Sequence, residues 1–320
     1  MHFSDSLIKQ IRSKKSVVCV GLDPRLEKIP AFIREAGRAK FSHSGDCRED
    51  DALAAAGEAI FQFNKGIIDA VADLVPVVKP QIAFYEMYGA PGMQAFSDTL
   101  KYAKSKGLMT IADAKRNDVG STAEAYASAF LGTTSVFGEQ VSAFEADSVT
   151  VTPYLGWDGI KPFLDVAKKN GKGLFVLVKT SNKSSGDLQD LAVGVGSDQM
   201  HPLYETVGHY VESWGADDVG DEGFSCVGAV VGATYPQQAK KLRVLMPETI
   251  FLVPGFGAQG GTVEDVLPCF LPGGMGAIIN SSRDVIFAYE KSDTHGEADY
   301  AAAAREKVQE MNEQLKVVFE

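Results

Sequence analysis

The fold is decided by the stretch Leu108-Met109-Thr110-Ile111-Ala112-Asp113-Ala114-Lys115-Arg116-Asn117-Asp118. Leu108–Ala114 is a strand-length, mostly apolar run without alternation of polar and apolar residues, and the stretch ends in a cluster of charges. A strand that is covered on both faces, as in a parallel sheet, has this apolar character. The charges at its end predict a functional edge, because chemistry in parallel α/β folds gathers where the strands end.

Seven further apolar runs of strand length occur along the chain: Val17–Leu22, Val75–Ile82, Ser148–Val151, Leu174–Lys179, Val227–Val231, Ile250–Val253 and Ala277–Asn280. Amphipathic stretches of helix length lie between them, for example Gly92–Lys106, Ser121–Phe130, Gly159–Lys169, Pro236–Met246 and Thr262–Cys269. Eight such units without a break in composition predict an α/β fold, one (β/α)8 TIM barrel that forms a single domain over residues 1–320. A doubly wound open sheet is the alternative, but the turn after the first strand lacks the glycine-rich fingerprint of that fold.

Two stretches exceed a minimal barrel. Ala31–Asp50 is polar, and Asn182–Met200 is rich in Ser, Asn, Gly and Asp, so both are interpreted as surface insertions or mobile loops. Ala298–Phe319 is expected to end the chain as a closing helix.

Composition limits the class of partner. The 320 residues are 45% hydrophobic and 23% charged, which suits a globular protein with a large core. The formal net charge of −11, without a basic cluster, argues against nucleic acid as a partner. No apolar run reaches the length of a membrane span and the N-terminus has no signal-peptide pattern, so we expect a cytoplasmic protein without membrane contact.

The cysteines give no indication of a metal site. Cys19, Cys47, Cys226 and Cys269 are far apart and form no CxxC pair, which leaves zinc and thioredoxin-like interpretations without support. Cys19 and Cys226 lie in apolar runs, where a small buried side chain is the simpler interpretation.

Five charged residues fall at or near predicted strand ends: Asp23, Lys79, Asp113, Lys115 and Asp118. Asp113 and Lys115 are two apart, which in an extended strand places both side chains on one face. A structural Lys–Asp ion pair between two strands is the alternative for any single pair. Five convergent charges exceed what such a pair needs, and clustered charges of this kind mark functional sites.

A second group of polar residues follows the last two predicted strands. Gly255 and Gly257 free the backbone to present N–H groups, Gln259 adds a neutral donor, and Arg283 can bind a phosphate with two parallel hydrogen bonds. Barrel enzymes often hold phosphate between the loops after strands seven and eight. A plain turn beside a surface arginine is the alternative.

The run from Asp113 to Thr122 fills every fixed position of D-x-K-x-x-D-[IV]-G-x-T, and it resembles the signature of the orotidine 5′-phosphate decarboxylase family. The resemblance extends from about Val17 to Arg283 and is closest to the longer, type 2 subfamily. It implies a TIM barrel that converts orotidine monophosphate to UMP and CO2 in pyrimidine biosynthesis. It also implies that neither a cofactor nor a metal takes part.

The resemblance also implies roles around the reacting carbon. Lys115 would be the proton donor to C6 of the pyrimidine, and Asp113 would face the substrate carboxylate. Lys79 would bridge Asp113 and the ribose, and Asp23 would accept a hydrogen bond from a ribose hydroxyl. A lysine ammonium aimed at C6 stabilises the carbanion left by CO2 and then supplies the proton.

The remaining implied roles concern the partner subunit, the base and the phosphate. Asp118 and Thr122 would reach the ribose in the partner subunit's site, which implies a homodimer with shared active sites. Ser181 would hold the amide edge of the pyrimidine. The phosphate would be held by the side chains of Gln259 and Arg283, with help from the backbone near Gly257 and Ser282.

Three alternatives stay open. A metal-dependent sugar-phosphate decarboxylase or aldolase of the same suprafamily shares D-x-K-x-x-D, but Ser181 and Gln259 favour a nucleotide. A Schiff-base aldolase would use Lys79, Lys115 or Lys179 as nucleophile, although neighbouring carboxylates would keep Lys115 protonated. A non-catalytic phosphate-binding barrel has no need for five convergent charges.

Overall fold

The computed structural model describes residues 1–41, 49–194, 200–257 and 260–320. Eight parallel strands close into a barrel in the order β1-β12-β11-β10-β7-β6-β3-β2. Their bounds are β1 Val18–Leu22, β2 Val77–Pro80, β3 Met109–Arg116, β6 Ser148–Val151, β7 Gly173–Lys179, β10 Val227–Val231, β11 Phe251–Pro254 and β12 Ala277–Ser281. The predicted TIM barrel is therefore confirmed.

All eight predicted apolar runs correspond to barrel strands, with ends that shift by at most two residues. Every residue of β1, β6 and β10 is buried, as expected where side chains fill the barrel on one face and helices cover the other. The apolar character of these runs therefore follows from burial on both faces.

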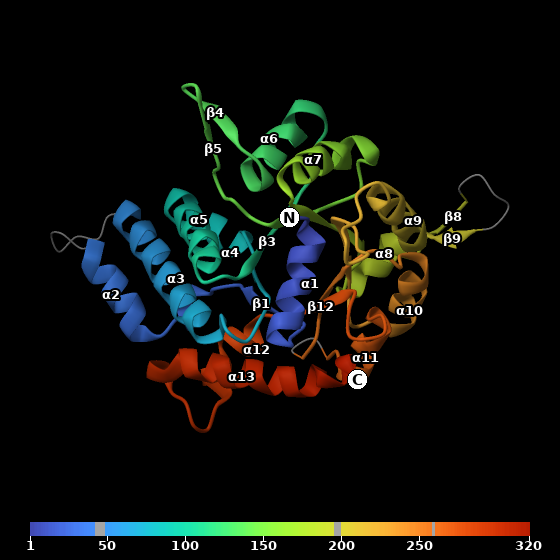
Figure 1. Ribbon diagram of the computed structural model, residues 1–320. Helices are drawn as coiled ribbons and strands as arrows, with labels where there is room; N and C mark the ends of the chain where they lie inside the picture. The colour runs from blue at the N-terminus through green and yellow to red at the C-terminus, as the bar shows by residue number, and fades with distance from the viewer. Residues whose placement is uncertain (42–48, 195–199, 258–259) are drawn as a thin grey trace.

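Helices surround the barrel and cover its outer face (Figure 1). Their bounds are α1 Phe3–Lys14, α2 Ala31–Phe41, α3 Glu49–Val71, α4 Ala83–Glu86, α5 Gly89–Ser105, α6 Gly120–Leu131, α7 Trp157–Asn170, α8 Gly186–Gln189, α9 Leu203–Gly215, α10 Pro236–Leu245, α11 Val263–Val266, α12 Arg283–Ile286 and α13 Tyr300–Leu315. The predicted closing helix corresponds to α13. Among the described residues, no helix combines the length and the apolar character that crossing a bilayer requires.

Helix α1 covers the end of the barrel where the strands begin. Its residue Phe3 packs edge-on against Phe175 of β7, with ring centroids 6.0 Å apart, and it lies directly over Gly173, the first residue of β7. Leu7, Ile8 and Ile11 continue the same buried face. In Figure 1, α1 lies at the centre of the ring of outer helices. The opposite end, where the strands finish, is left for the site.

The two predicted insertions are more regular than expected. Residues 31–41 form α2, which packs closely on α3: a Cβ at Gly37 would lie 2.8 Å from the carbonyl oxygen of Ala55. The second insertion contains α8 and strand β8 Ala192–Val193. Strand β8 pairs antiparallel with β9 His201–Pro202, which follows the insertion. Residues 42–48 and 195–199 of these insertions lie outside the described residues.

The hairpin β4–β5 was likewise not predicted from the sequence. Strands β4 Thr134–Val136 and β5 Glu139–Val141 pair antiparallel outside the barrel, and all six residues are exposed. Because they bury no apolar face, they leave no hydrophobic pattern in the sequence.

Candidate active site

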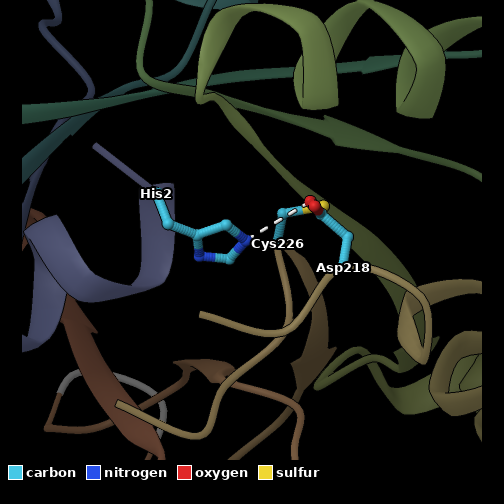
Figure 2. Close-up of side chains that lie close together, drawn as sticks. All are labelled: His2, Asp218 and Cys226. Carbon is cyan, nitrogen blue, oxygen red and sulfur yellow. Dashed lines mark hydrogen bonds and ion pairs between the residues drawn. The ribbon is translucent and has the colours of Figure 1, made fainter. Parts of the chain in front are cut away.

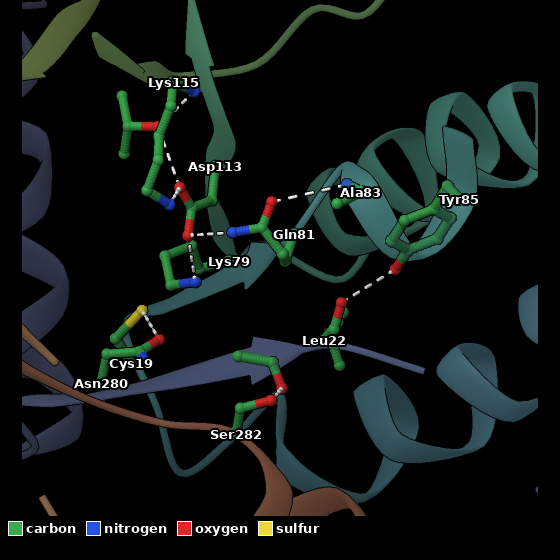
Figure 3. A network of polar contacts seen from close by, with 12 residues as sticks. Cys19, Leu22, Lys79, Gln81, Ala83, Tyr85, Asp113, Lys115, Asn280 and Ser282 are labelled. Carbon is green, nitrogen blue, oxygen red and sulfur yellow. Dashed lines mark hydrogen bonds and ion pairs between the residues drawn. The ribbon is translucent and has the colours of Figure 1, made fainter. Parts of the chain in front are cut away.

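Asp113, near the end of β3, is the centre of a network of polar contacts at the mouth of the barrel. Its Oδ2 lies 2.8 Å from Lys79 Nζ, and its Oδ1 lies 2.6 Å from Lys115 Nζ. Gln81 Nε2 donates a further hydrogen bond of 2.9 Å to Oδ2. Figure 3 shows these three side chains converging on Asp113, Lys79 from β2, Gln81 from just after β2 and Lys115 from β3. The structure therefore brings together Lys79, Asp113 and Lys115, as predicted.

The predicted reason for this arrangement was wrong, because β3 is not extended at Lys115. The pairing of β3 with β6 shifts between Ala112 and Arg116, and Lys115 has a positive φ of 46°. This bulge, rather than the two-residue period of a strand, turns the Lys115 side chain back toward Asp113. A left-handed conformation costs a residue with a Cβ roughly 1–2 kcal/mol, so neighbouring contacts have to hold it in place.

Thr150 of β6 supplies those contacts. Its Oγ1 accepts a hydrogen bond of 2.9 Å from the backbone N–H of Lys115 and donates one of 3.0 Å to Asp113 Oδ1. One hydroxyl therefore fixes both the bulged backbone and the carboxylate that pairs with the lysine.

The charges of this network stabilise one another. Burial opposes ionisation of Asp113, but the ammonium groups of Lys79 and Lys115 outweigh it and hold the pKa of Asp113 well below its usual range. Burial likewise opposes a charge on Lys79, but the carboxylates of Asp113 and Asp23 raise its pKa. The side chains of Lys79 and Asp113 are only 6% and 9% exposed, whereas that of Lys115 is 44% exposed. Lys115 is thus the ammonium group that is open to a ligand.

Asp23 follows β1 on the other side of Lys79. Burial raises its pKa, while the charge of Lys79 and the polar side chain of Ser282 oppose the rise. Its Oδ1 is buried and has no hydrogen-bond partner among the described residues. A buried carboxylate oxygen without a donor suits a ligand hydroxyl group, because leaving it unpaired is costly.

Asp118 and Thr122 stand apart from this network. Asp118 Oδ1 accepts a hydrogen bond of 2.8 Å from the N–H of Val119, and Thr122 is exposed on the first turn of α6. Within the described part of the chain, neither forms a hydrogen bond or an ion pair with Asp113 or Lys115. The five predicted charges thus form a group of four with Asp118 outside it.

The residues predicted to bind the base and the phosphate follow β7, β11 and β12. Ser181 is half-buried after β7, and Ser282 Oγ donates a 3.0 Å hydrogen bond to the carbonyl of Gly21 at the end of β1. Arg283 begins α12, is exposed, and has no ion pair with another described residue. Gln259 lies outside the described residues.

The glycine-rich loop after β11 closes on itself. Gly257 has a φ of 72°, and its N–H donates a 3.0 Å hydrogen bond to the carbonyl of Gly261. Gly260 also has a positive φ and donates to the carbonyl of Gly257 at 2.7 Å. In this conformation the Gly257 N–H is directed at the loop and not at a ligand.

Sequence reasoning missed Gln81 and Thr150. Gln81 is two residues after Lys79, and residues two apart in an extended segment share one face, so this spacing was the available signal in the sequence. In the structure Gln81 forms an isolated parallel bridge with Asp113. Thr150 lies in a fully buried strand, where a hydroxyl group needs a partner, but the sequence does not say which.

Comparison with known proteins bears on what this network does. Residues 16–295 match the model of the orotidine 5′-phosphate decarboxylase / HUMPS family. The chain belongs to that family. The predicted family resemblance is therefore confirmed over most of the chain.

Two curated members of the family are similar to this chain over nearly their whole length. The orotidine 5′-phosphate decarboxylase of Caldicellulosiruptor saccharolyticus is 45% identical over 290 residues, which cover 91% of each chain. That of Rhodopirellula baltica is 44% identical over 319 residues, 99% of each chain. Among solved structures, an orotidine-monophosphate-decarboxylase from Toxoplasma gondii is 31% identical with a TM-score of 0.73, covering 100% of this chain and 99% of that one.

Proposed function

We propose that this chain is a carboxy-lyase that converts orotidine 5′-monophosphate to UMP and CO2. The observation that carries the proposal is the Lys79–Asp113–Lys115 network at the mouth of a barrel of this family, with one partly exposed ammonium group. The fold and the family support the reaction, and the network supplies the groups that it needs. The product places the reaction in pyrimidine biosynthesis.

Lys115 is the residue proposed to donate the proton. Loss of CO2 leaves an electron pair at C6 of the pyrimidine, which a fixed positive charge nearby stabilises. The ammonium group of Lys115 is open to the barrel mouth yet is held by Asp113 at 2.6 Å, so it is both oriented and charged. The N–H bond then breaks as the C6–H bond forms, and no metal or cofactor is called for.

Asp113 and Lys79 are proposed to work as a pair. Placing the Asp113 carboxylate beside the substrate carboxylate opposes like charges in the bound state, and departure of CO2 relieves that repulsion. Lys79 holds Asp113 ionised and lies between Asp113 and Asp23. A ribose hydroxyl would donate a hydrogen bond to the unpaired Oδ1 of Asp23.

The far end of the substrate is assigned to the loops after β7, β11 and β12. Arg283 and Gln259 are proposed to bind the phosphate, with Ser181 on the amide edge of the base. Ser282 and Gly257 are proposed to contribute backbone N–H groups. The Gly257 N–H would have to exchange its bond to Gly261 for one to the phosphate, a change that phosphate binding could drive.

We further propose a homodimer with shared sites, located in the cytoplasm. Asp118 and Thr122 lie at the mouth but outside the network of their own chain, which suits side chains that complete a neighbouring site. Between α7 and α9 the surface has an apolar groove of about 680 Å³, and its lining includes the exposed side chains Tyr154, Trp157 and Tyr210. An exposed apolar patch of this kind is typical of a protein interface.

The test is the loss of orotate absorbance from orotidine monophosphate with EDTA-treated protein, together with detection of UMP. We expect turnover by the wild type and near-complete loss in Lys115→Ala. The matched control is Lys161→Ala, which removes another lysine that is ion-paired with an aspartate, on the outer surface. Turnover that requires added Mg²⁺ and a sugar phosphate would favour the metal-dependent members of the suprafamily, and full activity of Lys115→Ala would refute its role.

A further inference from the structure

At the end of the barrel opposite the active site, His2 meets two side chains of one hairpin, Asp218 and Cys226, of which Asp218 lies 216 residues later in the chain. His2 Nε2 lies 3.3 Å from Asp218 Oδ2, and both lie with Cys226 Sγ in a group whose ligand atoms are all within 4.8 Å of one another. Figure 2 shows the imidazole ring directed at the thiol and the carboxylate. His2 precedes α1, while Asp218 and Cys226 lie between α9 and β10.

The hairpin that carries Asp218 and Cys226 is rigidly built. Val219 and Ser225 form an antiparallel bridge, and the N–H of Cys226 donates to the carbonyl of Asp218 at 3.2 Å, so these two residues face each other across the hairpin. Helix α1 is fastened to the same hairpin by Ser4 Oγ, which donates to the carbonyl of Phe224 at 2.7 Å. All three candidate ligands are therefore held in place by contacts outside the cluster.

Ser4 also decides which nitrogen of His2 is available. Because its hydroxyl proton is used on the Phe224 carbonyl, Ser4 Oγ accepts from His2 Nδ1, which lies 2.7 Å away. With its proton on Nδ1, His2 points the lone pair of Nε2 at the carboxylate of Asp218, 3.3 Å away, so Nε2 is the nitrogen that can bind a metal ion. A second-shell hydrogen bond of this kind is typical of metal-bound histidine.

We propose that His2, Asp218 and Cys226 bind one Zn²⁺ ion that fastens the N-terminal segment to the hairpin before β10. Tetrahedral zinc places its nitrogen, oxygen and sulfur ligands roughly 3.3–3.7 Å from one another, so the His2–Asp218 distance already fits. Cys226 would have to move by about 1 Å at most. Binding forms the Zn–N, Zn–O and Zn–S bonds and releases the thiol proton to solvent, and a thiolate ligand selects zinc over magnesium.

The burial of the cluster leaves room for a fourth ligand. Cys226 is 1% exposed, whereas the side chains of His2 and Asp218 are 17% and 26% exposed. The cluster is therefore partly open to solvent at His2 and Asp218, and a water molecule would complete the coordination there. The site lies at the opposite end of the barrel from Lys115, so the role assigned to this metal is structural. The inference does not depend on the proposed reaction.

The test uses full-length protein without an affinity tag, stripped of metal and titrated with Co²⁺. We expect one equivalent to give the visible bands of tetrahedral cobalt and a thiolate-to-cobalt charge-transfer band, both abolished by Zn²⁺. Cys226→Ser should lose the charge-transfer band. His2→Ala and Ser4→Ala should weaken cobalt binding at least tenfold. Cys269→Ser is the matched control, because Cys269 is also free and buried but has no such cluster.

Two results would overturn the proposal. One is the absence of a one-equivalent cobalt spectrum in the wild type, and the other is a charge-transfer band that survives in Cys226→Ser. If circular dichroism shows that Cys226→Ser does not fold, His2→Ala is the deciding variant, because His2 precedes the first helix and its replacement leaves the core unchanged. Unchanged cobalt affinity in His2→Ala refutes the site. Orotidine monophosphate turnover should be the same in folded variants with and without zinc.

Discussion

Replacing Thr150 by valine tests whether the bulge in β3 is what aims Lys115. Valine has nearly the same shape as threonine and keeps the buried strand filled, but it lacks the hydroxyl group. The N–H of Lys115 then loses its acceptor, and Asp113 loses one of its donors. Lys115, at a φ of 46°, would no longer be held in its left-handed conformation.

The expected magnitudes follow from these two hydrogen bonds. A bond to a charged group contributes about 1.5–3 kcal/mol, and an unsatisfied buried N–H costs about 1–3 kcal/mol. Because Lys115 is partly exposed and water reaches its end of the strand, we expect a loss of about 2–4 kcal/mol in the free energy of unfolding. Misplacement of the ammonium group by about 1 Å should lower kcat by roughly 10- to 100-fold with little change in KM.

Thr110→Val is a closely matched control. Thr110 is also fully buried in the barrel, its Oγ1 donates to Asp147 Oδ2 at 3.1 Å, and the same atom accepts from the N–H of Asp147 at 3.1 Å. Urea unfolding should show similar losses in both variants, whereas only Thr150→Val should lose turnover. Thr150→Ser, which keeps the hydroxyl group, should recover most of kcat. A kcat for Thr150→Val within twofold of wild type would refute the reasoning.

Three further predictions concern the phosphate, the dimer and acid stability. Arg283→Ala should raise KM at least tenfold with a smaller effect on kcat in steady-state kinetics, and an unchanged KM would remove Arg283 from the phosphate site. Mixing inactive Asp118→Ala and Lys115→Ala subunits should restore activity if sites are shared, since a heterodimer then contains one intact site; no recovery would argue against sharing. The lowered pKa of Asp113 means that its ion pairs stabilise the fold fully above about pH 4, near its unfolded pKa, and progressively less as the pH falls toward the folded value. The difference in urea midpoint between wild type and Asp113→Asn should therefore shrink below pH 4, and a difference that stays constant down to pH 3 would contradict the assigned ionisation.

The barrel could be predicted from the sequence because each of its strands is buried on both faces. A run such as Val227–Val231 needs no partner residue to be recognised, since burial alone makes it apolar. Lys79, Asp113 and Lys115 were found for the complementary reason. Burying a charged side chain at the end of an apolar run costs free energy unless it is paired, so such a charge indicates a structural or functional role. The hairpin β4–β5 buries nothing, so the same signal could not reveal it.

What the sequence could not provide was geometry between distant residues. The bulge at Lys115 depends on Thr150 in the neighbouring strand, and nothing in the local pattern around Asp113 indicates it. The same holds for His2, Asp218 and Cys226, whose spacing resembles no metal motif and which meet only because α1 folds across the base of the barrel.

The closure of the barrel has a consequence for how the chain is made. Strand β1 needs β12 on one side, and Cys19 pairs with Asn280, 261 residues later. At translation rates of about 5–20 residues per second, one edge of β1 stays unpaired for roughly 13–52 seconds after it leaves the ribosome. Bringing together the two ends of a loop of that length costs about 5 kcal/mol of conformational entropy, in addition to a term that does not depend on loop length. The edge of β1, with its apolar residues Val18 and Val20, therefore stays open to chaperones and to other chains during this time, and truncations before β12 should aggregate rather than fold.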